Sequence, residues 1–335
     1  MLDPCPLRSV GTTALQVGPL GLGVAPLGNL YAQVTDADAE ATLVAAERHG
    51  VRWFDVAPLY GYGLAEHRLG RFLRQPPPLG PRILSTKVGR VLEPAPTAPA
   101  HEHFVAPLAY RPAFDYSRSG IERSYEESLR RLGIDRVQIL LLHDIDRFHH
   151  PAHRVLVKQL LDEALPTLHR LEAERRVEAI GLGIGEWDIG YEILASAEID
   201  CVLLAGRYTL LDHTAFSSGF LDACARRRVS VLAGGVFNSG FLAGGPHYDY
   251  RPASETLKSR RAQLLAFCDR FGVLLPAAAL QFTAAHPAIT SMVVGARSAQ
   301  EVDAIIQWHG ANIPAEFWNE LRTADLIPRE SPTPH

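Results

Sequence analysis

Short apolar runs alternate with longer amphipathic segments along most of the chain. Eight runs have the length of buried strands, at 20–23, 51–56, 83–86, 137–142, 179–184, 201–205, 229–233 and 292–294. Helical spacing of apolar residues follows at 35–49, 64–73, 119–132, 159–175, 221–227, 257–271 and from 299 onward. The run from Ile139 to Leu142 is apolar on both faces, which is typical of a parallel sheet covered by helices.

This alternation gives about eight strand–helix units, the number that closes a TIM (β/α)8 barrel. A doubly wound sheet has about six strands and fits less well. We therefore predict an α/β fold with one barrel domain over residues 1–330 and a frayed tail at 331–335. The turn at 10–17 predicts an N-terminal β-hairpin. The proline-rich segment 90–117 predicts a long irregular loop after strand 3, on the face where barrel enzymes hold their active sites.

Composition narrows the class of protein. The chain has 335 residues, of which 47% are hydrophobic and 21% charged, as in a folded globular protein. Its formal net charge of −4 comes without a basic block, which argues against nucleic acid as a partner. The pattern contains no membrane span and no signal peptide. The four scattered cysteines are typical of small buried side chains in a reducing compartment, so we expect a cytoplasmic protein.

Polar residues stand at the ends of three predicted strands. Asp55 lies between Phe54 and Val56 in an apolar run, and a buried carboxylate there needs a cationic partner. Lys87 ends the next strand, and His143 ends the fourth. Because parallel barrel strands end at one common face, we expect these side chains to meet there.

These residues carry a resemblance to a known family. The stretch from Phe54 to Gly61 resembles the F-D-x-A-x-x-Y-G signature of the aldo-keto reductases, and Lys87 and His143 match its strand-end T-K and L-H. The resemblance covers nearly the whole chain. It implies hydride transfer with a nicotinamide cofactor and a catalytic tetrad of Asp55, Tyr60, Lys87 and His143.

The tetrad has a simple chemical rationale. Tyr60 would exchange a proton with the reacting oxygen, and a positive Lys87 is expected to favour its phenolate. Asp55 would hold Lys87, and His143 would orient the substrate oxygen. Each residue also has a structural alternative when taken alone: a rim aromatic for Tyr60, a core histidine for His143, and an ion pair for Asp55 and Lys87.

The turn from Val294 to Glu301 resembles the family's cofactor loop, and its helix N-terminus suits a phosphate. The resemblance makes Arg297 the phosphate contact. Glu301 would repel a 2′-phosphate and accept from a ribose hydroxyl, which favours NAD, with NADP as the alternative. The other expected cofactor contacts are Gly23, Gly185, Tyr208, Phe237 and Gly295. The expected substrate contacts are Leu27 and Tyr62.

The runs 203–211 and 114–117 resemble the sugar-oxidising branch of the family, which includes D-threo-aldose, L-fucose and L-galactose dehydrogenases. This implies oxidation of the anomeric hydroxyl of a free aldose, of the L-fucose, D-arabinose or L-galactose type, to a lactone. The alternatives are oxidation of pyridoxal, NADPH-dependent reduction of aldehydes or ketones, and a regulatory subunit that senses the cofactor. The histidines after His143 lack zinc-type spacing, so no metal is expected.

Overall fold

The structure is a computed structural model that describes residues 7–78, 80–99 and 103–334. Of the four cysteines, Cys5 lies outside these residues, while Cys201, Cys224 and Cys268 are buried free thiols.

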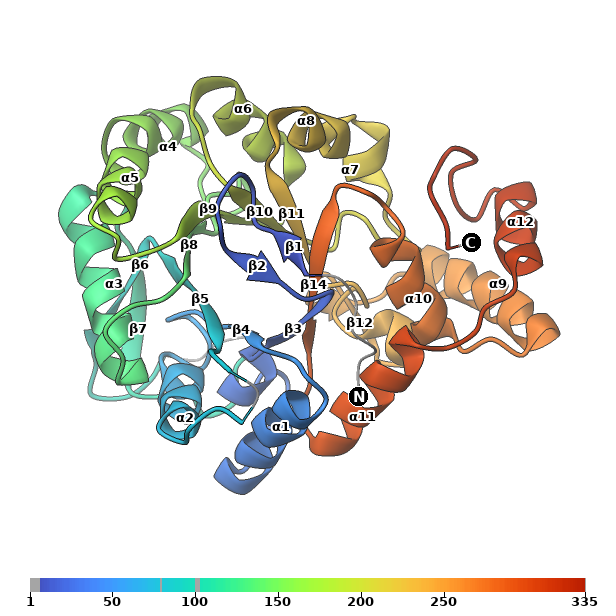
Figure 1. The fold of residues 1–335 in the computed structure, drawn as a ribbon, viewed down its shortest axis with the longest axis horizontal. Helices are drawn as coiled ribbons and strands as arrows, with labels where there is room; N and C mark the ends of the chain where they lie inside the picture. The colour runs from blue at the N-terminus through green and yellow to red at the C-terminus, as the bar shows by residue number, and fades with distance from the viewer. Residues whose placement is uncertain (1–6, 79, 100–102, 335) are drawn as a thin grey trace.

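The predicted strands close into one parallel barrel, seen end-on in Figure 1. Around the barrel they follow the order β3 (Leu20–Gly23), β4 (Trp53–Asp55), β5 (Ile83–Val88), β8 (Ile139–His143), β9 (Ala179–Ile184), β10 (Cys201–Ala205), β11 (Ser230–Gly234) and β14 (Ile289–Gly295). β14 pairs back onto β3 and so closes the ring. The (β/α)8 fold is confirmed, and all strand carboxyl ends share one mouth.

Helices form the outer layer around the strands (Figure 1). They are α1 (Asp36–Arg48), α2 (Leu64–Leu73), α3 (Arg118–Leu132), α4 (His153–Gln159), α5 (Leu165–Ala173), α6 (Trp187–Ser196), α7 (Thr214–Ser217), α8 (Phe220–Arg227), α9 (Glu255–Phe271), α10 (Leu275–Ala284), α11 (Ala299–His309) and α12 (Ala315–Thr323). The helix expected over 159–175 begins earlier, and the π-helical turn Leu160–Ala164 separates α4 from α5. Short 3₁₀ turns lie at Ala25–Gly28 and Phe241–Ala243.

The helix starts follow from their capping residues. Thr35, Ser117, Ser254 and Ser298 each accept a bond from a main-chain N–H in the first turn of α1, α3, α9 and α11. Such caps satisfy N–H groups that have no partner inside the helix.

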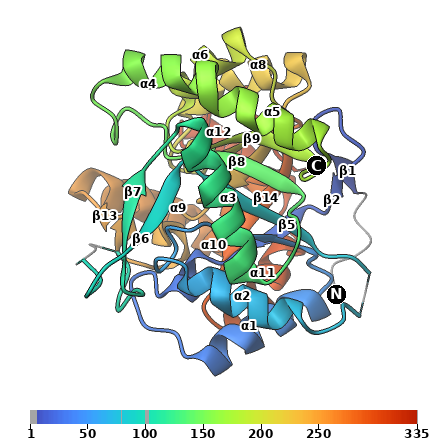
Figure 2. The same cartoon turned by 90° about the vertical axis from the view of Figure 1, so that its left-hand side faces the viewer.

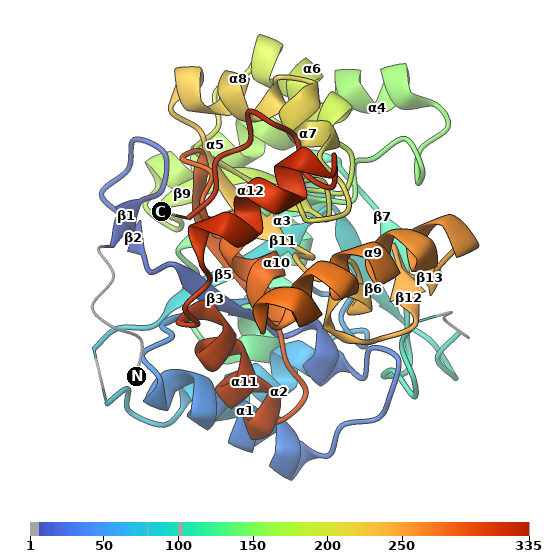
Figure 3. The ribbon, with the colours of Figure 1, turned by 90° about the vertical axis from the view of Figure 1, so that its right-hand side faces the viewer.

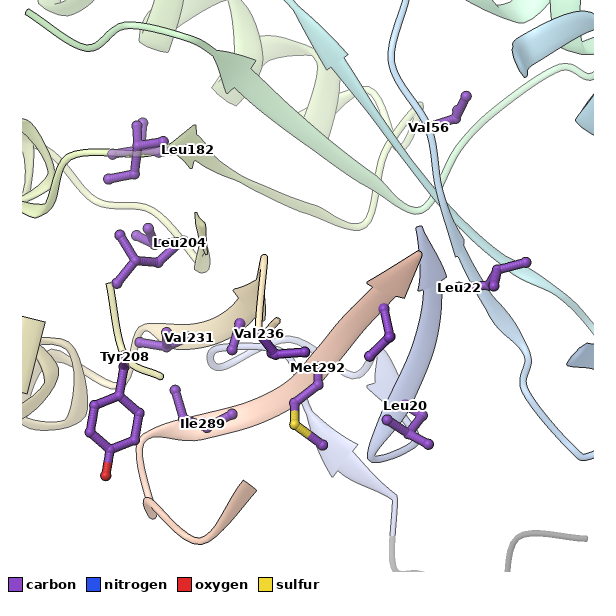
Figure 4. Close-up of a cluster of buried hydrophobic side chains, with 14 of the residues drawn as sticks. Leu20, Leu22, Val56, Leu182, Leu204, Tyr208, Val231, Val236, Ile289 and Met292 are labelled. Atoms are coloured by element: carbon purple, nitrogen blue, oxygen red, sulfur yellow. The ribbon is translucent and has the colours of Figure 1, made fainter. Parts of the chain in front are cut away.

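The barrel has an inner and an outer core. Inside, Trp53 and Leu141 pack with Val10, Leu15 and Val17 of the N-terminal hairpin. The outer core fills the space between strands and helices, and Figure 4 shows part of it, with Leu204, Val231 and Met292 among its side chains.

The predicted N-terminal hairpin is present, as β1 (Arg8–Ser9) paired with β2 (Gln16–Val17). It covers one end of the barrel, where the Gly11 N–H donates to Ser230 Oγ at 2.8 Å. Figures 2 and 3 show this hairpin at the opposite end from β6 (Arg90–Pro94) and β13 (Arg251–Pro252). The N-terminal end is thus closed, which leaves the other end for a site.

The loop after β5 is more regular than we expected. It contains an antiparallel ribbon, β6 (Arg90–Pro94) and β7 (Tyr110–Phe114), in which Arg90 pairs with Phe114. Prolines are tolerated because both strands of a two-stranded ribbon are edges. A second ribbon, β12 (His247–Tyr248) with β13 (Arg251–Pro252), follows β11.

The C-terminal segment also differs from the expectation of a frayed tail. Ser331 is buried, and Arg322 of α12 donates to the Ser331 carbonyl at 3.1 Å and to Thr333 Oγ1 at 2.7 Å. These bonds hold the segment around Ser331 and Thr333 against α12. The proline content of the sequence does not reveal such contacts. His335 lies outside the described residues.

Among the described residues, no single helix has the length and apolar character to cross a membrane. α9 and α10 meet that test only as a pair, and they are bent by 99°.

Close strand packing predicts that alanine is tolerated at one glycine, Gly18, and destabilises the fold at another, Gly181. A Cβ on Gly181 of β9 would lie 1.9 Å from the Cys201 carbonyl oxygen, whereas one on Gly18 would meet nothing within 4 Å. We expect Gly181→Ala to lower the free energy of unfolding by more than about 3 kcal/mol, and Gly18→Ala to change it by less than about 0.5 kcal/mol. Urea denaturation measures both, and equal stabilities would contradict this packing.

Candidate active site

The tetrad predicted from the sequence comes together at the barrel mouth. Lys87 Nζ donates to Asp55 Oδ2 at 2.6 Å and to Tyr60 Oη at 3.0 Å. The His143 ring stands edge-on to the Tyr60 ring, with 6.1 Å between their centroids. The four side chains therefore form one contiguous group.

Strand register explains how Asp55 and Lys87 meet. Asp55 of β4 lies beside Ser85 of β5, and Ser85 Oγ donates to Asp55 Oδ1 at 2.7 Å. Two residues along β5, Lys87 points to the same side and reaches Oδ2. The Lys87 and Asp55 side chains are only 2% and 4% exposed, so the ion pair is shielded from water.

The electrostatics of Tyr60 differ from our expectation of a favoured phenolate. Burial raises the pKa of Tyr60 well above its ordinary value, and the charges of Asp55 and Asp144 raise it further. The charge of Lys87 is offset by Asp55 at 2.6 Å. Tyr60 is therefore a protonated phenol in the free protein, with Lys87 donating to its oxygen and the phenol proton left to face a substrate.

His143 is held as a neutral imidazole. Burial lowers its pKa to about 3, with Lys87 and Arg90 acting in the same direction. Tyr116 Oη donates to the His143 carbonyl at 2.6 Å and fixes the end of β8. A neutral ring can donate one hydrogen bond to a substrate oxygen without adding charge.

The strand ends divide the mouth into two arcs. β4, β5 and β8, which are neighbours, carry the tetrad, while glycines occupy the ends of the other strands. These glycines are Gly23, Gly185, Gly206, Gly234, Gly235 and Gly295. A Cβ on Gly185 would have Asp146 Oδ2, at 3.8 Å, as its nearest neighbour. Main chain without side chains suits the close approach of an extended cofactor, so this arc fits a dinucleotide.

The predicted phosphate loop lies where β14 leads into α11. Ser298 caps α11, so main-chain N–H groups gather at this helix start. Arg297 Nη2 donates to Glu301 Oε1 at 3.0 Å, and both side chains are partly exposed. Gly295 is required by packing, because a Cβ there would lie 2.9 Å from Pro26 Cγ. The Arg297 N–H donates to Glu301 Oε2 at 2.8 Å and the Glu301 N–H to Ser298 Oγ, so a phosphate at this loop would share Arg297 with the Glu301 carboxylate.

The two aromatic residues expected to contact the cofactor have different surroundings. Tyr208 is 3% exposed, and its ring stacks on Phe282 of α10 with 5.1 Å between centroids. Figure 4 shows this side chain within the buried apolar cluster, which leaves its ring no open face for a cofactor. Phe237 is half-buried at the mouth and stands edge-on to Trp308 of α11.

The two predicted substrate contacts are core residues. Leu27 is fully buried in a 3₁₀ turn, where its carbonyl accepts from Arg68 at 2.6 Å. Tyr62 is 2% exposed, at a left-handed position of the loop after β4. Neither side chain is exposed to a ligand, because each lies buried in the loop that follows its strand.

Aromatic rings from three other loops stand at the mouth instead. Phe104 lies 6.2 Å from the Tyr60 ring, and Tyr31 stacks on His247 at 4.6 Å. Tyr250 is 51% exposed and stacks on His103 at 5.2 Å. The 90–117 segment, which carries His103 and Phe104, was expected at this face, whereas Tyr31, His247 and Tyr250 were not, since their loops meet only in the folded chain.

Two charged residues at the mouth were also missed, Arg207 at the glycine-ended arc and Asp144 beside the tetrad. Arg207 follows β10, donating to the Gly185 carbonyl and to Asp249 Oδ2, both at 2.7 Å. Asp144 follows His143 and pairs with Arg90 at 2.8 Å. The signal was available in part, because each is a charged residue directly after an apolar strand or one position beyond it.

A small acidic cluster lies next to His143. Ligand-type atoms of Asp144, Asp146 and His149 lie within 4.8 Å of one another. Asp144 is already paired with Arg90, and Asp146 accepts main-chain N–H groups from Gly185 and Glu186. The contacts of these acids are thus those of a hydrogen-bonded ion-pair network.

The chain belongs to the aldo/keto reductase family, whose sequence model matches residues 19–325. A pyridoxal 4-dehydrogenase from Microbacterium luteolum is 40% identical, covering 96% of this chain and 97% of that protein. A D-threo-aldose 1-dehydrogenase from a Pseudomonas species is 36% identical, covering 96% and 98%. An aldo-keto reductase structure from Bacillus halodurans shares the fold, with a TM-score of 0.72, 23% identity, and coverage of 95% and 96%. The chain is therefore an oxidoreductase of this family, which uses NAD(P)H cofactors generally.

The burial of Asp146 predicts that the effect of Asp146→Asn on the free energy of unfolding depends on pH. Burial raises its pKa to about 7, with Asp144 adding to the shift. Between about pH 4 and 7 the folded carboxyl holds a proton that the unfolded chain releases, so this group's contribution to stability falls as pH rises. Asp146→Asn should match the wild type near pH 4 and exceed it at pH 8 by roughly 2–4 kcal/mol.

Urea denaturation at several pH values measures this gain. The exposed Asp269→Asn serves as the control and should show no comparable gain. A constant difference between Asp146→Asn and the wild type across this range would contradict the burial of a titrating carboxyl.

Proposed function

We propose that this chain oxidises the anomeric hydroxyl of a free aldose, in its cyclic form, to a lactone with NAD(P). The observation that carries the proposal is the Lys87 contact to both Tyr60 and Asp55 beside His143. The 36% identity to a D-threo-aldose 1-dehydrogenase and the 31% identity to an L-galactose dehydrogenase from Arabidopsis thaliana support the sugar class. Substrates of the L-fucose, D-arabinose or L-galactose type belong to this proposal.

The reaction removes a hydride from the anomeric carbon and a proton from the anomeric hydroxyl group. When bound, the nicotinamide supplies the hydride acceptor and, in its oxidised form, a positive charge. His143 donates its N–H to the anomeric oxygen and positions it by Tyr60. Tyr60 receives the hydroxyl proton, so it must first have released its own proton to solvent. Lys87 stabilises the resulting phenolate, and Asp55 keeps the ammonium in place.

Pyridoxal is the second candidate substrate. It is favoured by the 40% identity to a pyridoxal 4-dehydrogenase and by the aromatic rings of Phe104 and Tyr250 at the mouth. The chemistry is shared, because pyridoxal closes to an internal hemiacetal with its neighbouring hydroxymethyl group. Both substrates thus present a hemiacetal C–H and O–H to the tetrad.

Two other functions remain as outcomes of the same assay. An aldehyde or ketone reductase would prefer NADPH and reject all hemiacetals, whereas a cofactor-sensing subunit would bind NAD(P) without turnover. The hydrogen bonds of Lys87 to Asp55 and Tyr60, with the His143 ring beside Tyr60, favour an enzyme. We place the protein in the cytoplasm on the basis of its free thiols at Cys201, Cys224 and Cys268.

A substrate panel with a Tyr60 variant tests this function. Purified protein with NAD would receive L-fucose, D-arabinose, L-galactose and pyridoxal, and reduced nicotinamide would be followed by absorbance. We expect Tyr60→Phe to lower kcat on the active hemiacetal by about 10³-fold or more, because the proton acceptor is lost. Cofactor affinity, from fluorescence titration, should stay within about twofold.

The control is Tyr191→Phe, which removes a hydroxyl on α6 that makes one long bond, 3.4 Å, to the Gly219 carbonyl. It should keep wild-type turnover. Silence on every hemiacetal together with NADPH-dependent reduction of aldehydes would refute the proposed direction, and full activity of Tyr60→Phe would refute the mechanism.

Glu301 predicts the choice of cofactor. Its carboxylate sits at the start of α11 beside Arg297, where it would repel a 2′-phosphate. Wild-type protein should therefore prefer NAD. Glu301→Gln should raise the ratio of kcat/KM for NADP over NAD about tenfold, or ~1.4 kcal/mol. Glu316→Gln on α12 is the control, and an initial preference for NADP would contradict this role.

A further inference from the structure

Asp144 directly follows His143, and the mechanism above gives it no task. Arg90 donates to its Oδ2 through Nε at 3.0 Å and Nη2 at 2.8 Å. Its other oxygen, Oδ1, lies 3.5 Å from His143 Nε2. Arg90 thus clamps one carboxylate oxygen and leaves the other directed at the catalytic ring.

The two nitrogens of His143 have different surroundings. The neutral imidazole carries a single N–H, on either Nδ1 or Nε2. Nδ1 is buried and has no hydrogen-bond partner within the described part of the chain, while Nε2 faces Asp144 Oδ1. An N–H on Nδ1 would be buried unpaired and would leave two lone pairs facing each other at Nε2 and Oδ1. The surroundings therefore favour the Nε2–H tautomer.

The main chain fixes the position of Asp144. Asp144 has a φ of +52°, a left-handed conformation that is strained for residues other than glycine, asparagine and aspartate. Its N–H donates to the Gly183 carbonyl at 3.0 Å, and its carbonyl accepts from Tyr116 Oη at 3.1 Å. These bonds on both sides of Asp144 fix its main chain and so the position from which its carboxylate reaches His143.

We propose that Asp144 is a positioning residue that holds His143 as the Nε2–H tautomer, so that this N–H is the one donated to the substrate oxygen. The proposal rests on the proposed function for the identity of that oxygen. The tautomer itself is a property of the free protein, which separates the two tests.

Two substitutions at Asp144 change the group that faces His143 and leave the main-chain conformation as it is. Asparagine and glycine both tolerate a φ of +52°, so neither should disturb the main chain. Asp144→Asn gives its one oxygen to Arg90 and turns its N–H₂ donor toward Nε2, whereas Asp144→Gly removes both groups. Asp249→Gly is the matched control, because Asp249 also has positive φ, at +45°, and an arginine partner, Arg207.

Two-bond ¹H–¹⁵N NMR couplings at neutral pH report the tautomer, with His143→Gln assigning the signal. We expect Nε2–H in the wild type and in Asp249→Gly, and Nδ1–H in Asp144→Asn, whose amide N–H₂ needs an acceptor at Nε2. Asp144→Gly should show a substantial Nδ1–H population and lose about tenfold in kcat with little change in KM. A purely structural role would shift melting temperature without moving the tautomer.

An Nδ1–H signal in the wild type would overturn the proposal, as would an unchanged Nε2–H signal in Asp144→Gly. If the wild type shows Nε2–H and Asp144→Gly loses it, yet no hemiacetal is oxidised, the tautomer assignment stands and the proposed function fails.

Discussion

The site depends on one buried ion pair, between Asp55 and Lys87. Removing two ions from water costs several kcal/mol each, so the pair persists only if every donor and acceptor is matched. Ser85 Oγ and Lys87 Nζ satisfy the Asp55 carboxylate. An ammonium has three donors. Two go to Asp55 and the Val56 carbonyl, so the third goes to Tyr60 Oη at 3.0 Å. The same bonds that stabilise the barrel interior thus orient the Tyr60 phenol.

Around this pair the mouth combines rigid strand ends with strained loops. The strands position the tetrad on β4, β5 and β8, opposite glycine-ended strands that suit a cofactor. Most described non-glycine residues with positive φ lie in the mouth loops, among them Tyr31, Asp144 and Tyr250. Strain of this kind persists where surrounding contacts over-determine it, and it gathers at functional sites. These loops carry the aromatic and charged groups that stand at the mouth.

The sequence predicted the barrel and the tetrad because both depend on local pattern. Each buried strand reads as an apolar run, and Asp55, Lys87 and His143 stand at strand ends, whose place in a barrel is set by topology. α10 escaped prediction because it is apolar on nearly every face and has no helical period. The protonated state of Tyr60 in the free protein was not expected, since burial, which the sequence does not express, raises the pKa of Tyr60. Tyr208 was misplaced because side-chain direction beyond a strand end depends on tertiary packing.

The most direct test asks whether the ion pair acts through Tyr60. Replacing both ions, as Asp55→Asn with Lys87→Met, avoids leaving a lone buried charge. The rate of hydride transfer would be measured for this double variant with Tyr60 and with Tyr60→Phe. With Tyr60 present, we predict a loss of about 10³-fold, and with Tyr60→Phe no further loss beyond about threefold. An equal loss in both backgrounds would contradict the account, as would wild-type turnover without the ion pair.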